Sequence, residues 1–347
     1  MDKGKTKKEL LIILVAVVAA ITVAHNNPFG RMFQPKDRQQ YHYNEGTIFG
    51  TIYHTKYLCD KDLQAEIEAE LQEVDASLSM FNPQSTISKI NKGESNEADE
   101  MLSEVLKLSF TINEATDGAF DPTVAPLVNA WGFGFKVGQL PDGRQVDSLL
   151  TLVGLSHIHF EGNTLTKDNP SSILDFSAIA KGYGVDRAAQ VLRNHDIKNF
   201  MVEIGGEVVT EGLNEKGEAW RIGINKPDDD STSVNTELQD IISLSGKAIA
   251  TSGNYRNFYI KDGRKIAHTI NPKTGYPAQQ DILSSTVMAP TCAEADAFAT
   301  AFMVLGMDEA KRILEKQPGL EAYFIYSDSL GNYRTWCSEG FRQYIIE

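Results

Sequence analysis

The sequence predicts an α+β fold, a mixed and largely antiparallel sheet with packed helices, in a single domain that allows for two lobes. Three observations support this prediction. Strand-like runs are short, amphipathic helical stretches alternate with them, and tight turns connect several of the runs. Gly205-Gly206, between two strand-like runs, predicts one such hairpin turn. The pattern favours this fold over a doubly wound parallel sheet.

The helices follow from apolar residues that recur every three or four positions. The first begins after the capping candidate Asp60 and carries its apolar stripe from Leu63 to Leu78. Helices are expected at 63–78, 102–112, 183–192 and 294–305. Strands are expected at 46–53, 173–176, 200–204, 208–210, 221–224, 248–251, 284–289 and 322–326.

The N-terminus predicts a signal or membrane anchor over residues 1–27. Lysines up to Lys8 precede an uncharged apolar run from Leu10 to Ala24. This pattern is typical of a secretory signal or a short anchor, and the positive charge keeps the start of the chain in the cytoplasm. Residues 28–40 are predicted to form a linker and 41–347 the folded domain. We therefore expect an extracytoplasmic (periplasmic) protein, either anchored by its N-terminus or secreted.

Composition excludes some classes of function. The formal net charge of −14 argues against non-specific nucleic-acid binding. The chain contains neither a phosphate-binding P-loop nor a dinucleotide-binding glycine fingerprint. Cys59, Cys292 and Cys337 have no metal-binding spacing, although in an exported protein one pair could be oxidised.

Asp296 and Thr300 form a candidate metal site. They are four residues apart in a predicted helix, so their side-chain oxygens project from the same face. One carboxylate and one hydroxyl suit Mg²⁺, which retains water ligands and takes further oxygens from substrate phosphates. A solvated helix face or a local hydrogen bond is the alternative interpretation of this pair.

Three further features are candidates for ligand binding. Lys181 lies where a predicted strand leads into a helix, and it would form an anion site with the helix N–H groups or be a surface lysine. His268 lies at the end of a predicted strand, as a general base or as a hydrogen-bonded structural residue. Trp131 or Phe133 would form the wall of a flat-ring site or pack in the core.

In their order along the chain, these runs resemble the ApbE family, the FAD:protein FMN transferases. The resemblance extends from residue 49 almost to the C-terminus. Each motif is weak alone, and their shared order makes the resemblance specific. The motifs are Phe49-Gly50-Thr51; Leu78-Ser79-Met80-Phe81 with Ser85-x-Ile87 and Ile90-Asn91; Asp121-Pro122-Thr123-Val124 with Trp131-Gly132-Phe133-Gly134; 175–183; Glu203-Ile204-Gly205-Gly206-Glu207; Ala250-Thr251-Ser252-Gly253; 268–275; and Ala295-Asp296 with Thr300.

The resemblance implies transfer of FMN from FAD to a threonine of an acceptor protein, with release of AMP. Such a phosphoryl transfer requires a positioned hydroxyl and, on the diphosphate, Mg²⁺. By resemblance, Mg²⁺ is held by the side chains of Asp296 and Thr300 and by the main-chain carbonyl of Ala178. His268 and Asp296 are the candidates for handling the threonine proton. The positions that match the family's FAD contacts are Phe49, where the family usually has methionine, Met80, Phe81, Asp121, Lys181 and Ile270.

The resemblance also implies partners and a location. The family's acceptors are membrane electron-transport subunits, and its members are usually anchored by a lipidated cysteine near the N-terminus. This chain lacks such a cysteine, so we expect anchoring by an uncleaved helix. Two alternatives share the predicted site: a Mg²⁺-dependent FAD pyrophosphatase that gives FMN and AMP, and a periplasmic FAD-binding protein without turnover. The pairing of Asp296 with Thr300 argues against the second, because a carrier does not require a metal on the phosphates.

Overall fold

The computed structural model describes residues 39–134, 140–227, 237–254, 258–261, 264–328 and 330–346. The residues from Tyr41 to Glu347 form one compact unit. The predicted signal or anchor and all but the last two residues of the predicted linker lie outside the described residues, so that division stays a prediction. None of the helices in the described ranges is long and apolar enough to span a membrane.

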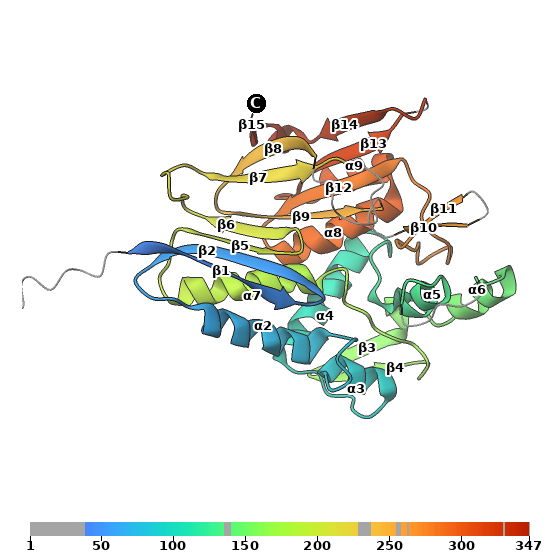
Figure 1. Ribbon diagram of the computed structural model, residues 1–347. Helices are drawn as coiled ribbons and strands as arrows, with labels where there is room; N and C mark the ends of the chain where they lie inside the picture. Colours follow the sequence, from blue (N-terminus) through green and yellow to red (C-terminus); the bar gives the residue numbers. More distant parts are fainter. Residues whose placement is uncertain are drawn as a thin grey trace, which may run out of the picture. The chain divides into compact units, whose positions relative to one another are not determined.

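An eight-stranded sheet forms the centre of the unit, in the order β1-β2-β5-β6-β9-β12-β13-β14 (Figure 1). Its strand pairs with known register, from β2–β5 to β13–β14, are all antiparallel. The strands are β1 (Gln40–Ile48), β2 (Thr51–Cys59), β5 (Phe200–Ile204), β6 (Glu207–Glu211), β9 (Lys247–Gly253), β12 (Ile282–Ala289), β13 (Glu321–Ser327) and β14 (Tyr333–Cys337).

Helices cover one face of this sheet in two layers. The helices α7 and α8 contact the strands directly, and α2 and α4 pack outside them. The remaining helices and turns lie around the edges and the site. The helices are α2 (Gln64–Leu78), α3 (Thr86–Lys92), α4 (Glu100–Ala115), η2 (Pro122–Val124), α5 (Ala125–Ala130), α6 (Gly143–Leu150), η3 (Leu155–His157), α7 (Ala180–Asn194), α8 (Cys292–Leu305), α9 (Met307–Leu314) and α10 (Glu339–Arg342).

A smaller sheet covers the other face. Val208 and Ile249 of the large sheet share a core cluster with Ile242, whereas their neighbours Val209 and Ala248 face the helices. Because both faces are covered, the central strands form a buried layer, which includes buried hydroxyl residues such as Thr286 as well as apolar ones. The smaller sheets are β15-β8-β7, of β7 (Trp220–Asn225), β8 (Leu238–Leu244) and β15 (Ile345–Ile346), and the hairpins β3 (Ile158–Glu161)–β4 (Thr164–Lys167) and β10 (Phe258–Lys261)–β11 (Arg264–Ala267).

The predicted fold class is confirmed, as are the four predicted helices, the Gly205-Gly206 turn and most of the strands. The predicted strand at 46–53 is wrong, because Phe49 and Gly50 form a turn between β1 and β2 with φ angles of 52° and 73°. Two adjacent left-handed residues suit a two-residue hairpin turn. Phe49 is apolar, so the sequence gives no sign of a turn at this position.

Two further predictions need correction. The segment 173–176 is not a strand: Leu174 exchanges backbone hydrogen bonds with the side-chain amide of Asn91, at 2.8 and 2.9 Å, rather than with a neighbouring strand. Helix α7 begins at Ala180, three residues before the predicted start at 183. Gly182 lies in the first turn, where its small size allows a close approach to another helix.

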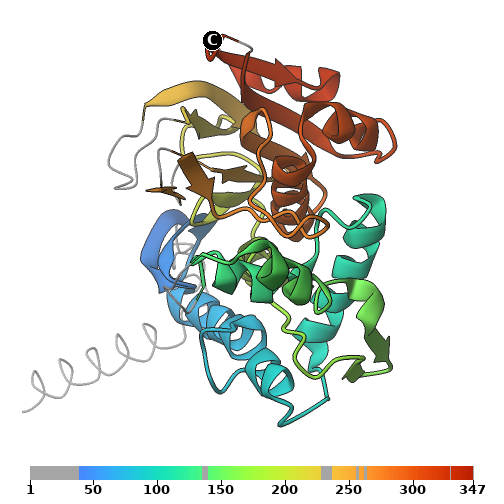
Figure 2. The same cartoon turned by 90° about the vertical axis from the view of Figure 1, so that its right-hand side faces the viewer.

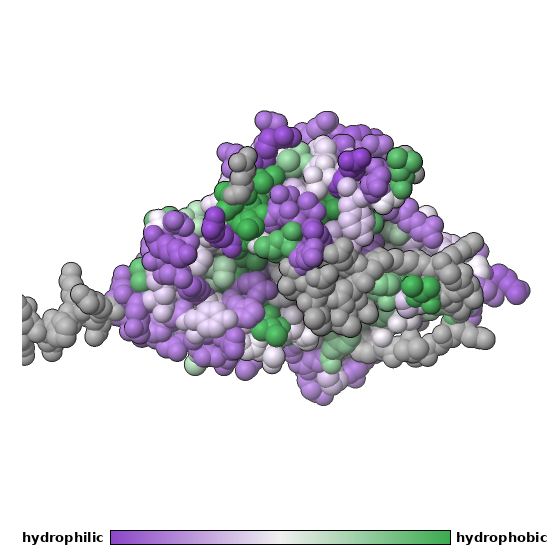
Figure 3. All heavy atoms as spheres, turned by 45° about the horizontal axis from the view of Figure 1, so that its top comes forward, coloured by the Kyte–Doolittle hydropathy of each residue, from purple (hydrophilic) through white to green (hydrophobic). Residues whose placement is uncertain are grey.

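The surface in the view of Figure 3 is mostly hydrophilic where it is coloured, and apolar residues form small groups between polar ones. In this respect it is an ordinary protein surface, which keeps a substantial apolar fraction. Segments far apart in the sequence meet beside the helical layers, where α5 lies next to the chain that follows β11 (Figure 2). Leu127 and Ile270 pack in one cluster there, and the Trp131 indole N–H donates to the Gly275 carbonyl at 2.7 Å.

Candidate functional site

Two adjoining cavities bring together every residue predicted to act in catalysis, to bind the metal or to contact FAD. The larger has a volume of about 650 Å³ and the smaller about 410 Å³. They share the lining residues Val128, Asp175, Ser177, Lys181 and His268. Of the other predicted residues, Phe49, Met80 and Phe81 line the larger cavity, and Asp121, Ala178, Ile270, Asp296 and Thr300 line the smaller.

The larger cavity has an apolar and aromatic wall. Phe49, in the β1–β2 turn, packs against α7 where Gly184 has no side chain; a Cβ atom at Gly184 would lie 2.5 Å from the Phe49 ring. Phe81 is 63% exposed, and Phe133 lies 5.2 Å from Tyr259 between ring centroids. Such a wall suits a flat aromatic ring. Of the two predicted aromatic candidates, Phe133 lines this cavity, whereas buried Trp131 packs in the core.

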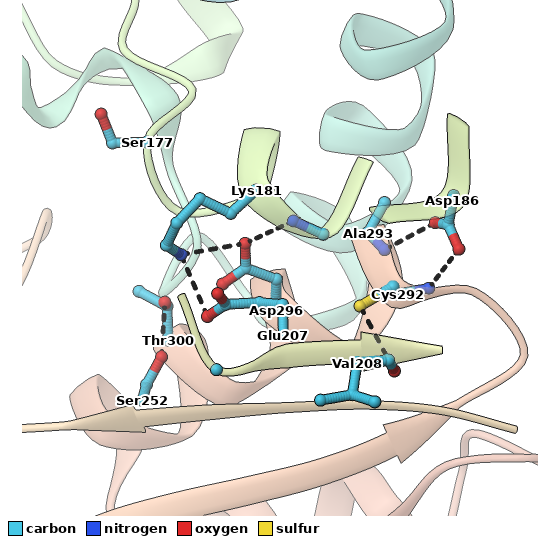
Figure 4. Close-up of polar contacts among 12 residues, drawn as sticks. Ser177, Lys181, Asp186, Glu207, Val208, Ser252, Cys292, Ala293, Asp296 and Thr300 are labelled. Carbon is cyan, nitrogen blue, oxygen red and sulfur yellow. Dashed lines mark hydrogen bonds and ion pairs between the residues drawn. The ribbon is translucent and has the colours of Figure 1, made fainter. Parts of the chain in front are cut away.

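A charged cluster lies at the wall of the smaller cavity (Figure 4). The Lys181 ammonium is 3.0 Å from Glu207 Oε1 and 3.5 Å from Asp296 Oδ2. The same Asp296 oxygen accepts the Gly182 N–H at 3.1 Å. Asp296 and Glu207 are buried on α8 and β6, so the cluster joins helices α7 and α8 to the sheet. Lys181 therefore binds acidic side chains of the protein itself and is not a surface lysine.

Burial and the neighbouring charges set the ionisation of this cluster. Burial by itself lowers the pKa of Lys181, but the carboxylates of Asp296 and Glu207 outweigh it and hold that pKa above its usual value. Burial raises the pKa of Glu207 to about 8, against the opposing effect of Lys181. Glu207 Oε2 is buried and has no hydrogen-bond partner among the described residues. Near neutral pH Glu207 is therefore mostly protonated, and Lys181 pairs with the Asp296 carboxylate. A cation bound nearby would favour the ionised form of Glu207 and balance its charge.

Glu207 is the residue that motif reasoning missed as a site residue. It begins β6 directly after the Gly205-Gly206 turn, and the antiparallel register pairs it with Ile204. In the sequence the turn indicates a hairpin connection and belongs to a family motif, and neither feature assigns Glu207 to the site. An acidic residue at the start of a strand whose next residues are apolar was the available signal, because a carboxylate at a buried position requires a partner.

Asp296 and Thr300 lie one helical turn apart on α8, as predicted, and both line the smaller cavity with Ala178. The Thr300 and Ser252 hydroxyl oxygens are 3.0 Å apart. Carboxylate, hydroxyl and carbonyl oxygens are ligands that Mg²⁺ accepts, so the donor set fits this ion. No group of three or more His, Cys, Asp or Glu side chains in the described ranges is placed to hold a metal. A cation here would depend on hydroxyl, carbonyl and phosphate oxygens as well.

Asp121 is already engaged within the protein. Its carboxylate accepts hydrogen bonds from the Thr123 N–H at 2.8 Å, the Thr123 hydroxyl at 2.5 Å and the Leu155 N–H at 3.1 Å. Burial raises the pKa of Asp121 despite these donors. Its carboxylate links η2 to the start of η3 through these hydrogen bonds. A ligand that contacts Asp121 would therefore meet a carboxylate that already has a structural role.

His268 and Ile270 follow strand β11, as the sequence indicated. His268 lines both cavities, and its ring lies edge-on to Phe133 with centroids 6.3 Å apart. Ile270 is buried and forms a β-bridge with Pro277. The bridge fixes the backbone next to His268, which places the imidazole where the two cavities meet.

The junction of α7 and α8 supports the charged cluster. Asp186 on α7 accepts the N–H groups of Cys292 and Ala293 at the start of α8, both at 2.9 Å. Burial raises the pKa of Asp186 to about 6, although these donors oppose the shift. Cys292, like Cys59 and Cys337, is a free thiol, so the pairing considered from the sequence does not occur in this structure.

Fold and site together define a class: an α+β protein in which an apolar ring-binding cavity adjoins a charged pocket that suits phosphate and a cation. The model of the ApbE family matches residues 49–324. The chain therefore belongs to the ApbE family, and the resemblance seen in its motifs is confirmed.

Relatives match along most of their length. A protein from Vibrio cholerae serotype O1, named FAD:protein FMN transferase, is 37% identical over 321 residues, which cover 89% of this chain and 94% of the relative. The solved flavin transferase ApbE from Vibrio cholerae has a TM-score of 0.79 at 35% identity, covering 88% of this chain and 99% of that chain. The apo crystal structure of Pseudomonas stutzeri flavinyl transferase ApbE has a TM-score of 0.78 at 30% identity, with 88% and 97% covered.

Proposed function

We propose that this chain is a Mg²⁺-dependent FAD:protein FMN transferase that attaches FMN to a threonine hydroxyl of an acceptor protein and releases AMP. Flavin transfer from FAD follows from membership of the ApbE family, whose curated relatives carry that enzyme name. The metal, the threonine and the nature of the acceptor are our proposal. The acceptors would be subunits of membrane electron-transport complexes.

The observation that carries the proposal is the charged cluster beside the ring cavity. Lys181 lies between Asp296 and Glu207, and Thr300 lies one turn along α8 from Asp296. When a ring of FAD occupies the larger cavity, the diphosphate of FAD reaches this cluster. Asp296, Thr300 and Ala178 would hold Mg²⁺, and the ion would neutralise charge on the phosphoryl oxygens.

The residues of the chain divide the chemistry between them. Lys181 adds positive charge next to the phosphates, and the apolar wall excludes water from the ring side of the bond that breaks. Asp296 is engaged by Lys181 and the Gly182 N–H. We assign His268, because it lines both cavities, to accept the proton of the threonine hydroxyl as that oxygen attacks phosphorus and AMP leaves.

One assay tests the activity. The full chain, purified in detergent, is incubated with FAD, Mg²⁺ and a candidate acceptor domain, and the products are separated on a denaturing gel and viewed for flavin fluorescence. We expect a fluorescent acceptor band and released AMP, both lost with a chelator or when valine replaces the acceptor threonine. Free FMN without a labelled acceptor would favour the pyrophosphatase, and intact FAD throughout would contradict both enzyme activities.

Asp296→Asn tests the proposed metal ligand. Loss of the carboxylate weakens metal binding at the phosphates, so we expect flavin transfer to fall at least about 100-fold, while FAD affinity changes by less than about threefold. AMP release measures the first quantity and quenching of flavin fluorescence the second. Full activity in this variant would remove Asp296 from the site.

We also propose that the folded domain lies on the extracytoplasmic, periplasmic face of the cytoplasmic membrane, held by the N-terminal segment. The support is the lysine-led apolar run that ends at Ala24. The segment lies outside the described residues, so this proposal rests on the sequence.

A further inference from the structure

Asp175 lies on the wall that the two cavities share. It belongs to the extended segment before α7, and its N–H donates to the Pro122 carbonyl at 2.7 Å. Its Oδ1 atom accepts the Ser177 N–H at 2.8 Å and the Ser177 hydroxyl at 2.5 Å. These bonds fix the orientation of the carboxylate, and burial raises its pKa despite them.

The second oxygen of Asp175 remains available. Within the described part of the chain, the only hydrogen bonds to its carboxylate are the two that Ser177 donates to Oδ1. A carboxylate oriented through one oxygen and open at the other is an acceptor for a ligand O–H or N–H group.

The other residues of the shared wall cannot take this role. Val128 is apolar, and the Ser177 hydroxyl already donates to Asp175. Lys181 is held by Glu207 and Asp296, and His268 is assigned to the threonine proton. Asp175 therefore supplies the free acceptor at the point where a ligand passes from one cavity to the other.

We propose that Asp175 is a positioning residue that accepts a hydrogen bond from a hydroxyl of the sugar segment of FAD. The inference rests on the proposed function: a ring of FAD occupies the larger cavity and the diphosphate lies beside Lys181. On either side of the diphosphate of FAD, the segment that leads to a ring carries hydroxyl groups, so a hydroxylated chain crosses the shared wall. A bond to one of its hydroxyls fixes how far the ring enters and hence where the phosphorus lies.

Binding of ring and sugar compounds distinguishes the two possible sources of the hydroxyl. Riboflavin and lumiflavin have the same flavin ring system, and only riboflavin carries the ribityl chain. Adenosine and adenine have the same purine ring system, and only adenosine carries the ribose. The Asp175→Asn substitution keeps the shape of the side chain and the oxygen that accepts from Ser177. We expect one of the two sugar-bearing compounds to bind the full-length variant about tenfold more weakly than it binds the wild type. The matching ring compound should bind both proteins equally. Loss for riboflavin identifies the ribityl chain, and loss for adenosine identifies the ribose.

Turnover supplies a second measurement. Because the bond aligns the phosphorus as well as holding FAD, we expect Asp175→Asn to raise KM for FAD and to lower kcat, whereas Asp168→Asn, at an exposed carboxylate outside both cavities, should change neither. Equal weakening of ring and sugar compounds would overturn the proposal, as would no weakening of either. Failure of the wild type to bind FAD would instead overturn the proposed function.

Discussion

At the scale of single residues, the charged cluster depends on a balance of charge. Lys181 is the one cation that contacts both Asp296 and Glu207 within the described residues. Removing the ammonium leaves the buried Asp296 carboxylate without a charged partner. Replacing Glu207, which is mostly protonated near neutral pH, leaves the ion pair of Asp296 and Lys181 in place. Breaking a buried pair is costly because the remaining charge has no partner.

This balance predicts different effects for two substitutions. We expect Lys181→Met to lower the free energy of unfolding by about 3 kcal/mol, and Glu207→Gln to lower it by less than about 1 kcal/mol. Urea unfolding at pH 7.5 in the presence of a chelator measures both values. The double variant should recover part of the loss. Equal losses in the two single variants would show that charge balance does not govern this cluster.

At the scale of elements, the contact between α7 and α8 places Lys181 and Asp296 together. A Cβ atom at Gly182 would lie 2.3 Å from the Cys292 carbonyl oxygen, closer than any side chain tolerates. The absence of a side chain at Gly182 therefore allows the helices to approach, and its N–H reaches Asp296 at 3.1 Å. The geometry of the charged cluster depends on this one small residue.

Gly182→Ala tests that dependence. The added methyl forces α7 and α8 apart, so we expect a loss of about 1–3 kcal/mol in the free energy of unfolding and a fall in flavin transfer. Gly143→Ala at the start of α6 is the control, because the nearest heavy atom to its Cβ, the Tyr276 hydroxyl oxygen, lies at 3.7 Å. Denaturant unfolding and the fluorescent gel assay measure the two effects. A Gly182→Ala protein as stable and active as the Gly143→Ala protein would contradict the packing argument.

The same junction predicts a dependence of stability on pH. The pKa of Asp186 is raised to about 6 in the folded protein, so the folded state keeps this proton to higher pH than the unfolded chain. The resulting stabilisation is complete below about pH 4, the usual pKa of aspartate, and is lost as the pH rises through about 6. Asp186→Asn lacks this titration. We expect the stability of the wild type relative to this variant to fall by about 2–3 kcal/mol between pH 4 and 7.5.

Urea unfolding of both proteins across that pH range measures the difference, and other titrating groups cancel in the comparison. A difference that stays constant with pH would mean that Asp186 titrates alike in the folded and unfolded states.

At the scale of the whole molecule, the site draws on segments from residue 49 to residue 304. The turn after β1, the chain before α7, the start of β6, the segment after β11 and helix α8 all contribute side chains. The two cavities can therefore form only when nearly the whole compact unit is folded.

The N-terminal segment makes the remaining prediction at this scale. We expect the full chain to sediment with membranes and to resist extraction at high pH, because about 15 apolar residues favour insertion. A chain that begins at Pro28 should stay in the supernatant. Fractionation followed by immunoblotting compares them, and equal distribution of the two chains would rule out anchoring by this segment.

Much of the fold and part of the site follow from local patterns in the sequence. The apolar stripe of α2, the spacing of Asp296 and Thr300 on α8 and the Gly205-Gly206 turn each depend on residues close together in the chain. Periodicity and turn chemistry are local properties, so sequence alone determined these elements. The order of the motifs determined the family.

Only the tertiary structure decided which side chains meet. The pairing of Lys181 with Glu207 and Asp296 joins positions far apart in the chain, and no local pattern encodes such a contact. The segment 173–176 is not a strand, because the side chain of Asn91, distant in sequence, satisfies the backbone of Leu174. The sequence by itself determined the elements and the family of this protein; long-range packing decided the site.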